Sequence, residues 1–267
     1  MTTSTYDPDF FPTLCAVEDR HFWFRTRNKV IETLVTQITA PLPSGYRVLE
    51  VGCGTGNTLR VLESVCTRGM VVGVDLYQEG LDLARQRVSC PLIRADVLRL
   101  PFAPGFDLIC LFDVLEHLPD DVRVLRALSD LLAPTGKLLL TVPASRSLWS
   151  YFDVAAHHCR RYETTDLRAA LDSAGFEIEY LSPFMVALYP ILWLGRRLAG
   201  FRKGNNPAQV SELARQDLRV GTISNTILSW SLAWELPFIR GRRRLPFGSS
   251  LVALAGKRGA PASLGKA

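Results

Sequence analysis

A strand that ends in a glycine-rich loop, at residues 47–56, is the feature that most constrains the fold of this chain. The first half, RVLEV, is apolar and rich in β-forming residues, which predicts a short buried strand. Gly52, Gly54 and Gly56 follow, and glycines permit a tight turn and a close approach of the backbone to a ligand. Helical spacing begins at Asn57, so the glycines precede a helix N-terminus with free N–H groups. The stretch therefore predicts a ligand site between a strand and a helix.

Two acids narrow the kind of ligand. Glu50 stands two residues before the first glycine, and Asp75 ends a second apolar run at residues 70–74. An acid at the tip of the second strand of a doubly wound sheet is placed to bond a ribose diol. The dinucleotide fingerprint requires G-x-G-x-x-G, whereas this loop reads G-x-G-x-G and position 57 is Asn. E-V-G-C-G-T-G followed by V-G-V-D resembles the class I S-adenosylmethionine (SAM)-dependent methyltransferases.

The resemblance implies a Rossmann-like, doubly wound seven-stranded α/β sheet whose last strand is antiparallel, with SAM as the cofactor. It further implies that Asp96 accepts from the adenine amino group and that the backbone N–H of Val97 reaches a ring nitrogen. The residues that the resemblance assigns to the cofactor are Glu50, Gly52, Gly54, Gly56, Asp75, Leu76, Asp96, Val97, Phe112 and Asp113. The motifs H-F-W-F-R-x-R at 21–27 and H-x-R-R-Y at 158–162 are similar to those of a small bacterial family close to the ubiquinone/menaquinone-type methyltransferases.

The pattern of the chain predicts four segments: an N-terminal helical lid at 1–46, a SAM-binding core at 47–182, a helical insertion at 183–248, and a final strand with a frayed tail at 249–267. Later strands are expected at 90–95, 106–111, 137–142, 176–181 and 250–255. The aromatic residues 22–24 either cap the cofactor or anchor their helix on the sheet.

The insertion departs from a minimal methyltransferase. Its apolar stretch 183–198 contains Pro190, and a turn at 204–207 and a polar helix at 211–220 follow. A second apolar stretch, 223–238, leads into the basic run 240–244. Apolar helices with aromatic residues and adjacent arginines suit a substrate cap, a dimer contact or a peripheral membrane contact.

Composition and signal patterns limit where the protein could act and what it could bind. The net charge is +5 and hydrophobic residues make up 48%, but no apolar run reaches the ~18 residues of a membrane-spanning helix. No secretory signal is visible and the six cysteines form no C-x-x-C pair, which predicts a cytoplasmic protein, with peripheral membrane contact as an alternative. Aliphatic rather than aromatic residues separate the basic clusters, so nucleic-acid binding is disfavoured.

The candidate catalytic residues are His158, His117 and Tyr162, which follow predicted strands on the substrate side. Three roles remain open for the histidines: a general base, a metal ligand or a purely positional group. The metal alternative comes from Asp113-x-x-Glu116-His117, with His157 or His158 as a further ligand. The spacing of the first three resembles the E-x-x-E-H metal motif of ubiquinone-pathway O-methyltransferases. Asp is shorter than the first Glu of that motif, so a divalent metal is not the favoured interpretation.

The sequence thus predicts a SAM-dependent methyltransferase that acts on a small or amphipathic, lipid-like acceptor, with oxygen preferred over nitrogen or carbon. Two other classes remain as alternatives: an NAD(P)-linked oxidoreductase, which the glycine spacing disfavours, and a non-catalytic SAM-binding interaction protein. The protein is expected to be a monomer or a homodimer.

Overall fold

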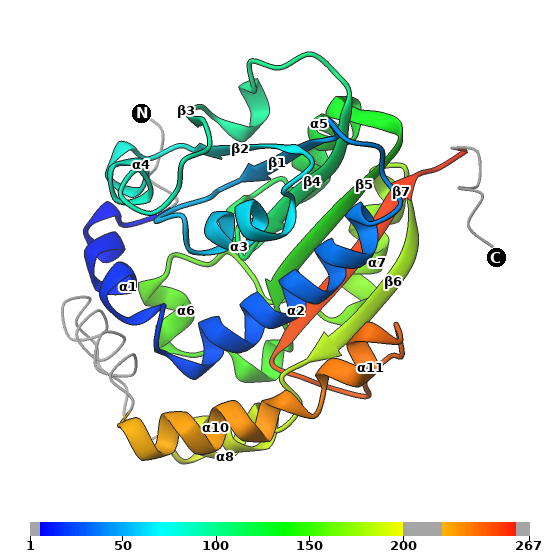
Figure 1. Cartoon of the computed structure of the whole chain (residues 1–267). Coiled ribbons are helices and arrows are strands. Elements are labelled where there is room, and N and C mark those ends of the chain that lie inside the picture. The colour runs from blue at the N-terminus through cyan, green and yellow to red at the C-terminus, as the bar shows by residue number, and fades with distance from the viewer. Residues whose placement is uncertain (1–5, 200–220, 260–267) are drawn as a thin grey trace.

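A seven-stranded sheet organises the chain, whose computed structural model describes residues 6–199 and 221–259 (Figure 1). The strand order is β3-β2-β1-β4-β5-β7-β6. The strands are β1 (Arg47–Val51), β2 (Met70–Asp75), β3 (Leu92–Arg94), β4 (Phe106–Phe112), β5 (Leu132–Pro143), β6 (Phe176–Phe184) and β7 (Ser250–Lys257). Only β7 is antiparallel to its two neighbours, because the strands from β1 to β5 all pair in parallel. The predicted fold class is confirmed.

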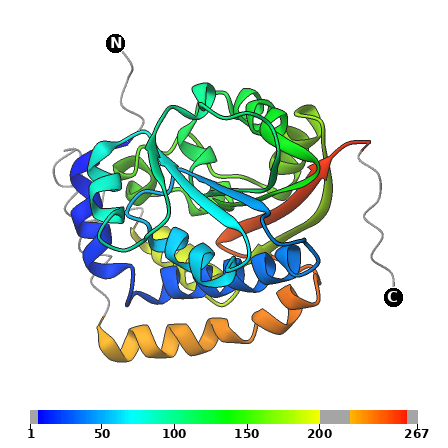
Figure 2. The same cartoon turned by 45° about the horizontal axis from the view of Figure 1, so that its top comes forward.

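Helices cover both faces of this sheet (Figures 1 and 2). One face carries α2 (Phe22–Thr39), α3 (Asn57–Val65), α4 (Gln78–Ala84), α10 (Thr222–Ala233) and α11 (Leu236–Arg240), which share one apolar core with it. The other face carries α5 (Asp121–Leu131) and α7 (Thr164–Ser173) over a second core. The described residues also form three shorter or peripheral α-helices, α1 (Phe11–Val17), α6 (Tyr151–Ala155) and α8 (Leu188–Ala199).

The helix α2 belongs to the core layer. Ile31, Leu34 and Val35 are fully buried against the sheet, so any lid consists of the residues that precede this helix. Phe22 anchors the start of α2 in the same core, whereas Phe24 packs with Phe10 of the N-terminal segment. Phe22 thus fits the anchoring interpretation, while capping of the cofactor by these aromatic residues stays a prediction.

The later strands all differ somewhat from their predicted bounds, β5 most of all. β5 begins at Leu132, because Leu132 pairs with Phe106 and the register shifts between Phe106 and Leu108, so the Pro-Thr-Gly sequence at 134–136 lies inside the strand. β3 is shorter than the predicted 90–95. The turn expected at 204–207, the helix expected at 211–220 and most of the expected frayed tail lie outside the described residues.

The insertion supplies α8, α10 and α11 between β6 and β7, and α10 packs on α2. Across the part of the chain that the structure describes, no helix combines the length and the apolar character needed to cross a bilayer. The four-segment division of the chain and the cytoplasmic location stay predictions.

Candidate active site

The glycine loop lies at the carboxyl end of β1, where the strand order reverses between β1 and β4. Gly52, Gly54 and Gly56 all have positive φ (76°, 49° and 78°), a conformation that side chains with a Cβ rarely adopt. A Cβ on Gly52 would also stand 2.3 Å from Cγ2 of Val114, the residue that follows β4 by two positions. The loop thus needs glycine both for its dihedral angles and for its close contact with the β4 end.

Two of the predicted cofactor acids are buried beside this loop. Glu50 is fully buried; Thr58 donates to its Oε1, and Oε2 has no hydrogen-bond partner among the described residues. Burial raises the pKa of Glu50 to about 8, against the opposing effects of Thr58 and Arg27. Asp75 accepts from the backbone N–H of Gly54 (2.7 Å) and Tyr77 (2.9 Å), yet burial raises the pKa of its carboxyl as well. For both acids, burial therefore outweighs the hydrogen bonds that the carboxyl accepts.

The third acid, Asp113, is held in a specific orientation at the end of β4. Its φ is +54°, a left-handed conformation that Asp tolerates better than most residues, and its N–H donates to the carbonyl of Thr141 on β5 (2.9 Å). Nη1 of Arg27 donates to Oδ2 of Asp113 at 2.8 Å, and Nη2 of the same arginine reaches Oδ1 of Asn57 at 3.3 Å. A side chain of α2 thus connects the β4 end with the first residue of α3.

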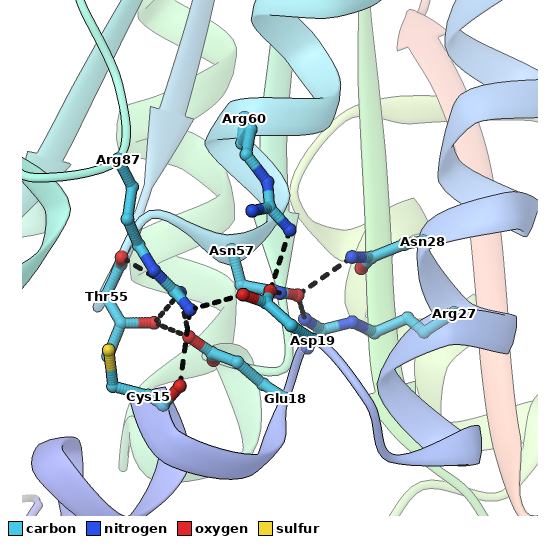
Figure 3. A network of polar contacts seen from close by, with 9 residues as sticks. All are labelled: Cys15, Glu18, Asp19, Arg27, Asn28, Thr55, Asn57, Arg60 and Arg87. Atoms are coloured by element: carbon cyan, nitrogen blue, oxygen red, sulfur yellow. Dashed lines mark hydrogen bonds and ion pairs between the residues drawn. The ribbon is translucent and has the colours of Figure 1, made fainter.

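A polar network fastens the N-terminal segment to the glycine loop (Figure 3). Arg87 is its centre: Nη1 donates to Glu18, and Nη2 donates to Oδ2 of Asp19 at 3.0 Å. The hydroxyl of Thr55, between two of the loop glycines, donates to Glu18 at 2.5 Å. Asp19 also accepts from Nδ2 of Asn57 at 3.2 Å. The residues ahead of α2 are therefore bonded directly to the loop that the sequence assigns to the cofactor.

The first described residue, Tyr6, lies across the same region. Its ring centroid is 4.9 Å from that of Phe11, 6.0 Å from Tyr77 beyond β2, and 5.6 Å from His117 beyond β4. Burial, with a smaller contribution from Asp75, raises the pKa of the Tyr6 phenol well above its usual range. An aromatic side chain of the N-terminal segment thus spans from the Asp75 side of the site to the histidines.

The histidines form a cluster with two buried carboxyl groups. Nδ1 of His158 is 3.0 Å from Oδ1 of Asp153, and the Arg161 Nε donates to the same oxygen at 2.7 Å. Burial alone would raise the pKa of Asp153, but the hydrogen bonds and charges of His158 and Arg161 outweigh it and lower the pKa to about 2. Asp153 is therefore ionised at neutral pH and fixes the ring of His158.

The opposite nitrogen of His158 points toward Glu116. Nε2 of His158 is 3.9 Å from Oε1 of Glu116, and the rings of His117 and His158 meet edge-on with centroids 4.7 Å apart. Burial, reinforced by the charge of Asp113, raises the pKa of Glu116 well above its usual range. One ligand atom each from Glu116, His117 and His158 lies within 4.8 Å of the other two, so the three side chains have a spacing that fits a metal ion.

The remaining predicted residues divide into two groups. Leu76 and Asp96 are exposed beyond β2 and β3, and Asp96 accepts from the N–H of Leu98 at 2.9 Å. Phe112 is buried at the end of β4, and Val97 is half-buried beyond β3. The Tyr162 hydroxyl donates to Asp121 at 2.8 Å, and burial raises the pKa of this phenol well above its usual range. The functional roles of all these residues stay predictions.

The geometry departs from the predicted metal set at Asp113. Its carboxylate pairs with Arg27, and the three-residue cluster consists of Glu116, His117 and His158. Sequence reasoning also gave no role to Arg27, Asp153 or Arg87. A signal for Asp153 was present in the L-W-S-x-x-D spacing before the H-x-R-R-Y motif, whereas the contacts of Arg27 and Arg87 join segments far apart in the chain.

A family model and two curated proteins that resemble this chain are described as methyltransferases. A family model described as a methyltransferase domain matches residues 23–181. The ubiquinone biosynthesis O-methyltransferase of Xanthomonas axonopodis pv. citri is 31% identical over 161 residues, which make up 52% of this chain and 66% of that protein. A probable SAM-dependent methyltransferase of Mycolicibacterium smegmatis is 28% identical over 171 residues, or 62% of this chain and 64% of that protein. The chain therefore spans slightly less than two thirds of the length of these relatives.

A solved structure provides a comparison of the fold alone. The phosphoethanolamine N-methyltransferase 2 of Haemonchus contortus, in complex with SAM, aligns with a TM-score of 0.55 at 20% identity, covering 85% of this chain and 52% of that one. The family match goes against the alternative of an NAD(P)-linked oxidoreductase. Because the family model covers more than half of the sequence, this chain belongs to the methyltransferase-domain family, the class I SAM-dependent methyltransferases that its glycine loop and strand-end acids resemble.

Proposed function

We propose that this protein transfers the methyl group of SAM to a small or amphipathic acceptor, preferably to a hydroxyl oxygen. The observation that carries the proposal is the pairing of His158 with buried, ionised Asp153 close to the strand ends that hold the cofactor acids. The name of the Xanthomonas relative, an O-methyltransferase of ubiquinone biosynthesis, supports an oxygen acceptor.

The residues at the strand ends fit SAM. The unpartnered Oε2 of Glu50 and the raised pKa of this buried carboxyl suit a cationic ligand group, such as the ammonium of the amino-acid part. Asp75 would hold the ribose hydroxyls, and Asp96 with the N–H of Val97 would hold the adenine. When bound, SAM supplies an electrophilic methyl group on a sulfonium sulfur.

His158 is the proposed proton acceptor. Asp153 takes the hydrogen bond from Nδ1, so the neutral ring presents Nε2 with a free lone pair on the side of Glu116. As the oxygen of the acceptor forms its new bond, its proton moves to Nε2, and the negative charge of Asp153 stabilises the imidazolium. Tyr6 and Phe11 contribute apolar surface that excludes water from the reacting groups.

The same cluster supports a second candidate chemistry, in which a divalent cation activates the acceptor. Glu116, His117 and His158 would hold the cation, and the buried Oε2 of Glu116, which lacks a hydrogen-bond partner within the described ranges, favours this alternative. A bound cation would lower the pKa of an acceptor hydroxyl and so replace a general base. Because the Asp113 carboxylate pairs with Arg27, it is not included in the proposed ligand set.

Turnover can be followed as formation of S-adenosylhomocysteine with a panel of hydroxylated aromatic and lipid-like acceptors. His158→Ala should lower turnover by roughly 10²–10⁴-fold while the affinity for SAM is retained. The matched control is His157→Ala, since the neighbouring His157 is exposed and should leave turnover unchanged. SAM binding without turnover on any acceptor would favour the non-catalytic alternative, and failure to bind SAM would refute the proposal.

A chelator separates the two chemistries. Full activity after dialysis against chelator supports His158 as the base, whereas loss of activity that a divalent ion restores supports the cation. In the second case Glu116→Gln should prevent the restoration, because the amide is a far weaker cation ligand than the carboxylate.

A further inference from the structure

One face of α10 is apolar and exposed. Ile223, Ile227, Trp230 and Trp234 recur at intervals of three and four residues, so they lie on the same side of the helix. Ile223 is 78% exposed and Trp230 is 79% exposed, the largest values among the exposed large hydrophobic side chains of the described residues. Figures 1 and 2 both show α10 along the lower edge of the molecule, next to α2.

The opposite face of α10 attaches the helix to the rest of the protein. Leu232 is fully buried and Leu228 packs on the same core, two positions that lie on the far side of the helix from Trp230. Asn225 accepts from the N–H of Phe22 at 2.6 Å and donates to the carbonyl of Arg20 at 2.7 Å. The exposed apolar face is therefore presented outward by a helix whose inner face is fixed.

Arginines follow the apolar face along the chain. Arg240, Arg242, Arg243 and Arg244 are all exposed at and beyond the end of α11. Glu235 is the only acid between residues 221 and 249, and it is buried, where it accepts from the N–H groups of Met185 and Val186. This described part of the insertion thus has exposed positive charge and no exposed acid.

We propose that this face, made of Ile223, Ile227, Trp230 and Trp234 together with the arginines 240–244, binds the surface of an anionic lipid membrane. Tryptophan favours the boundary between apolar chains and polar headgroups, and arginines are attracted to anionic lipids. An apolar helix face flanked by such residues lies in the plane of the interface without crossing it.

The charge distribution favours a lipid surface over the other occupants. A second copy meeting this face would bring a second group of four arginines into the assembly, and the segment 221–249 offers no exposed acid to pair with them. A role as a cap over the methyl acceptor is disfavoured, because the apolar face points away from α2 and therefore away from the rest of the protein. The inference goes beyond the proposed function and does not depend on which acceptor is methylated.

The test is co-sedimentation of the full chain with phosphatidylcholine vesicles, with and without phosphatidylglycerol. The protein should pellet with the anionic vesicles, and pelleting should fall as salt rises, because salt screens the attraction between arginines and lipid. Substituting both Ile227→Ser and Trp230→Ser should weaken partitioning roughly tenfold or more. The matched control is Met70→Ser, since Met70 is exposed at the start of β2, away from this face.

A second pair of variants tests the contribution of the arginine charges to vesicle binding. Arg243→Gln with Arg244→Gln should weaken binding by about fivefold per arginine. Arg123→Gln with Arg168→Gln removes the same charge from α5 and α7, on the other face of the sheet, and should change binding little. Unchanged SAM affinity in each variant shows that its fold is intact.

Three results would overturn the inference. The first is no pelleting with anionic vesicles at low salt. The second is pelleting that none of the α10 and arginine substitutions reduces. The third is a stable dimer in sedimentation velocity that Ile227→Ser with Trp230→Ser dissociates, because a second copy then covers this face.

Discussion

Arg87 offers the sharpest test of how the N-terminal segment is held on the glycine loop. Its side chain is 12% exposed and pairs with the Glu18 carboxylate, which is 4% exposed. Arg85, two residues earlier, is 52% exposed and pairs with Asp82, which is 59% exposed. Arg87→Met therefore removes a guanidinium from a buried ion pair, and Arg85→Met removes one from an exposed ion pair.

The expected magnitudes follow from this burial. Removing one partner of a buried ion pair costs about 3–5 kcal/mol, because the remaining charge is left uncompensated. The second partner of Arg87, Asp19, is 40% exposed and is therefore partly solvated, so we expect a loss of about 2–3 kcal/mol in the free energy of unfolding. An exposed pair contributes about 0–1 kcal/mol, which is the loss expected for Arg85→Met.

Urea unfolding measures both values, and limited proteolysis reports whether the residues ahead of α2 open more often in Arg87→Met. Adding Glu18→Gln to Arg87→Met should recover part of the loss, since the buried negative charge is then gone. A difference of less than about 0.5 kcal/mol between the two arginine variants would refute the burial argument. So would a double variant no more stable than Arg87→Met.

Two further predictions concern the cofactor acid and the start of α2. Asp75→Ala should weaken SAM binding at least tenfold by calorimetry, because charge-assisted hydrogen bonds contribute roughly 1.5–3 kcal/mol each. The control Asp82→Ala, at an exposed residue, should leave SAM affinity unchanged. Unchanged SAM affinity in Asp75→Ala would exclude Asp75 from the site. Nδ1 of His21 caps α2 by accepting from the N–H of Trp23, and burial lowers the pKa of this histidine from 6.5 to about 4. As the pH falls, the unfolded chain therefore takes up the proton before the folded protein does. Stability that is present above pH 6.5 is lost as the pH falls toward 4, by up to about 1.4 kcal/mol per pH unit. His21→Asn keeps a capping acceptor without this titration, and parallel stability curves for the two proteins in urea between pH 4 and 7 would contradict the assignment.

The strand and loop pattern was accessible from the sequence because its signals are local. The β1 run, its three glycines and Asp75 reflect the dihedral and burial preferences of neighbouring residues, and these predicted the strand and the loop. The seven-stranded sheet was implied by the family resemblance. The start of β5 was not predicted, because it is set by a contact with a distant residue. Leu132 belongs to β5 because it pairs with Phe106, and the local sequence at residues 134–136 does not predict that pairing.

The chemistry of the site depended on contacts that no local pattern contains. Arg27 reaches Asp113 across 86 positions in the chain, and that ion pair occupies the carboxylate that the motif had suggested for a metal. His158 was a candidate from its motif, but its pairing with Asp153 and its approach to Glu116 required the fold. Residue types near strand ends can thus be predicted, while their partners cannot.

The residues 18–22 connect the two additions to the sheet, the N-terminal segment and the insertion. Glu18 and Asp19 are bonded to Arg87 and, through Thr55 and Asn57, to the glycine loop. Directly after them, Asn225 of α10 bonds the carbonyl of Arg20 and the N–H of Phe22, on either side of His21. The helix that presents the proposed membrane face is therefore joined to the glycine loop by one short run of chain. Because His21 lies within that run, we expect its protonation to weaken the cap of α2 at the point where the N-terminal segment and the insertion meet.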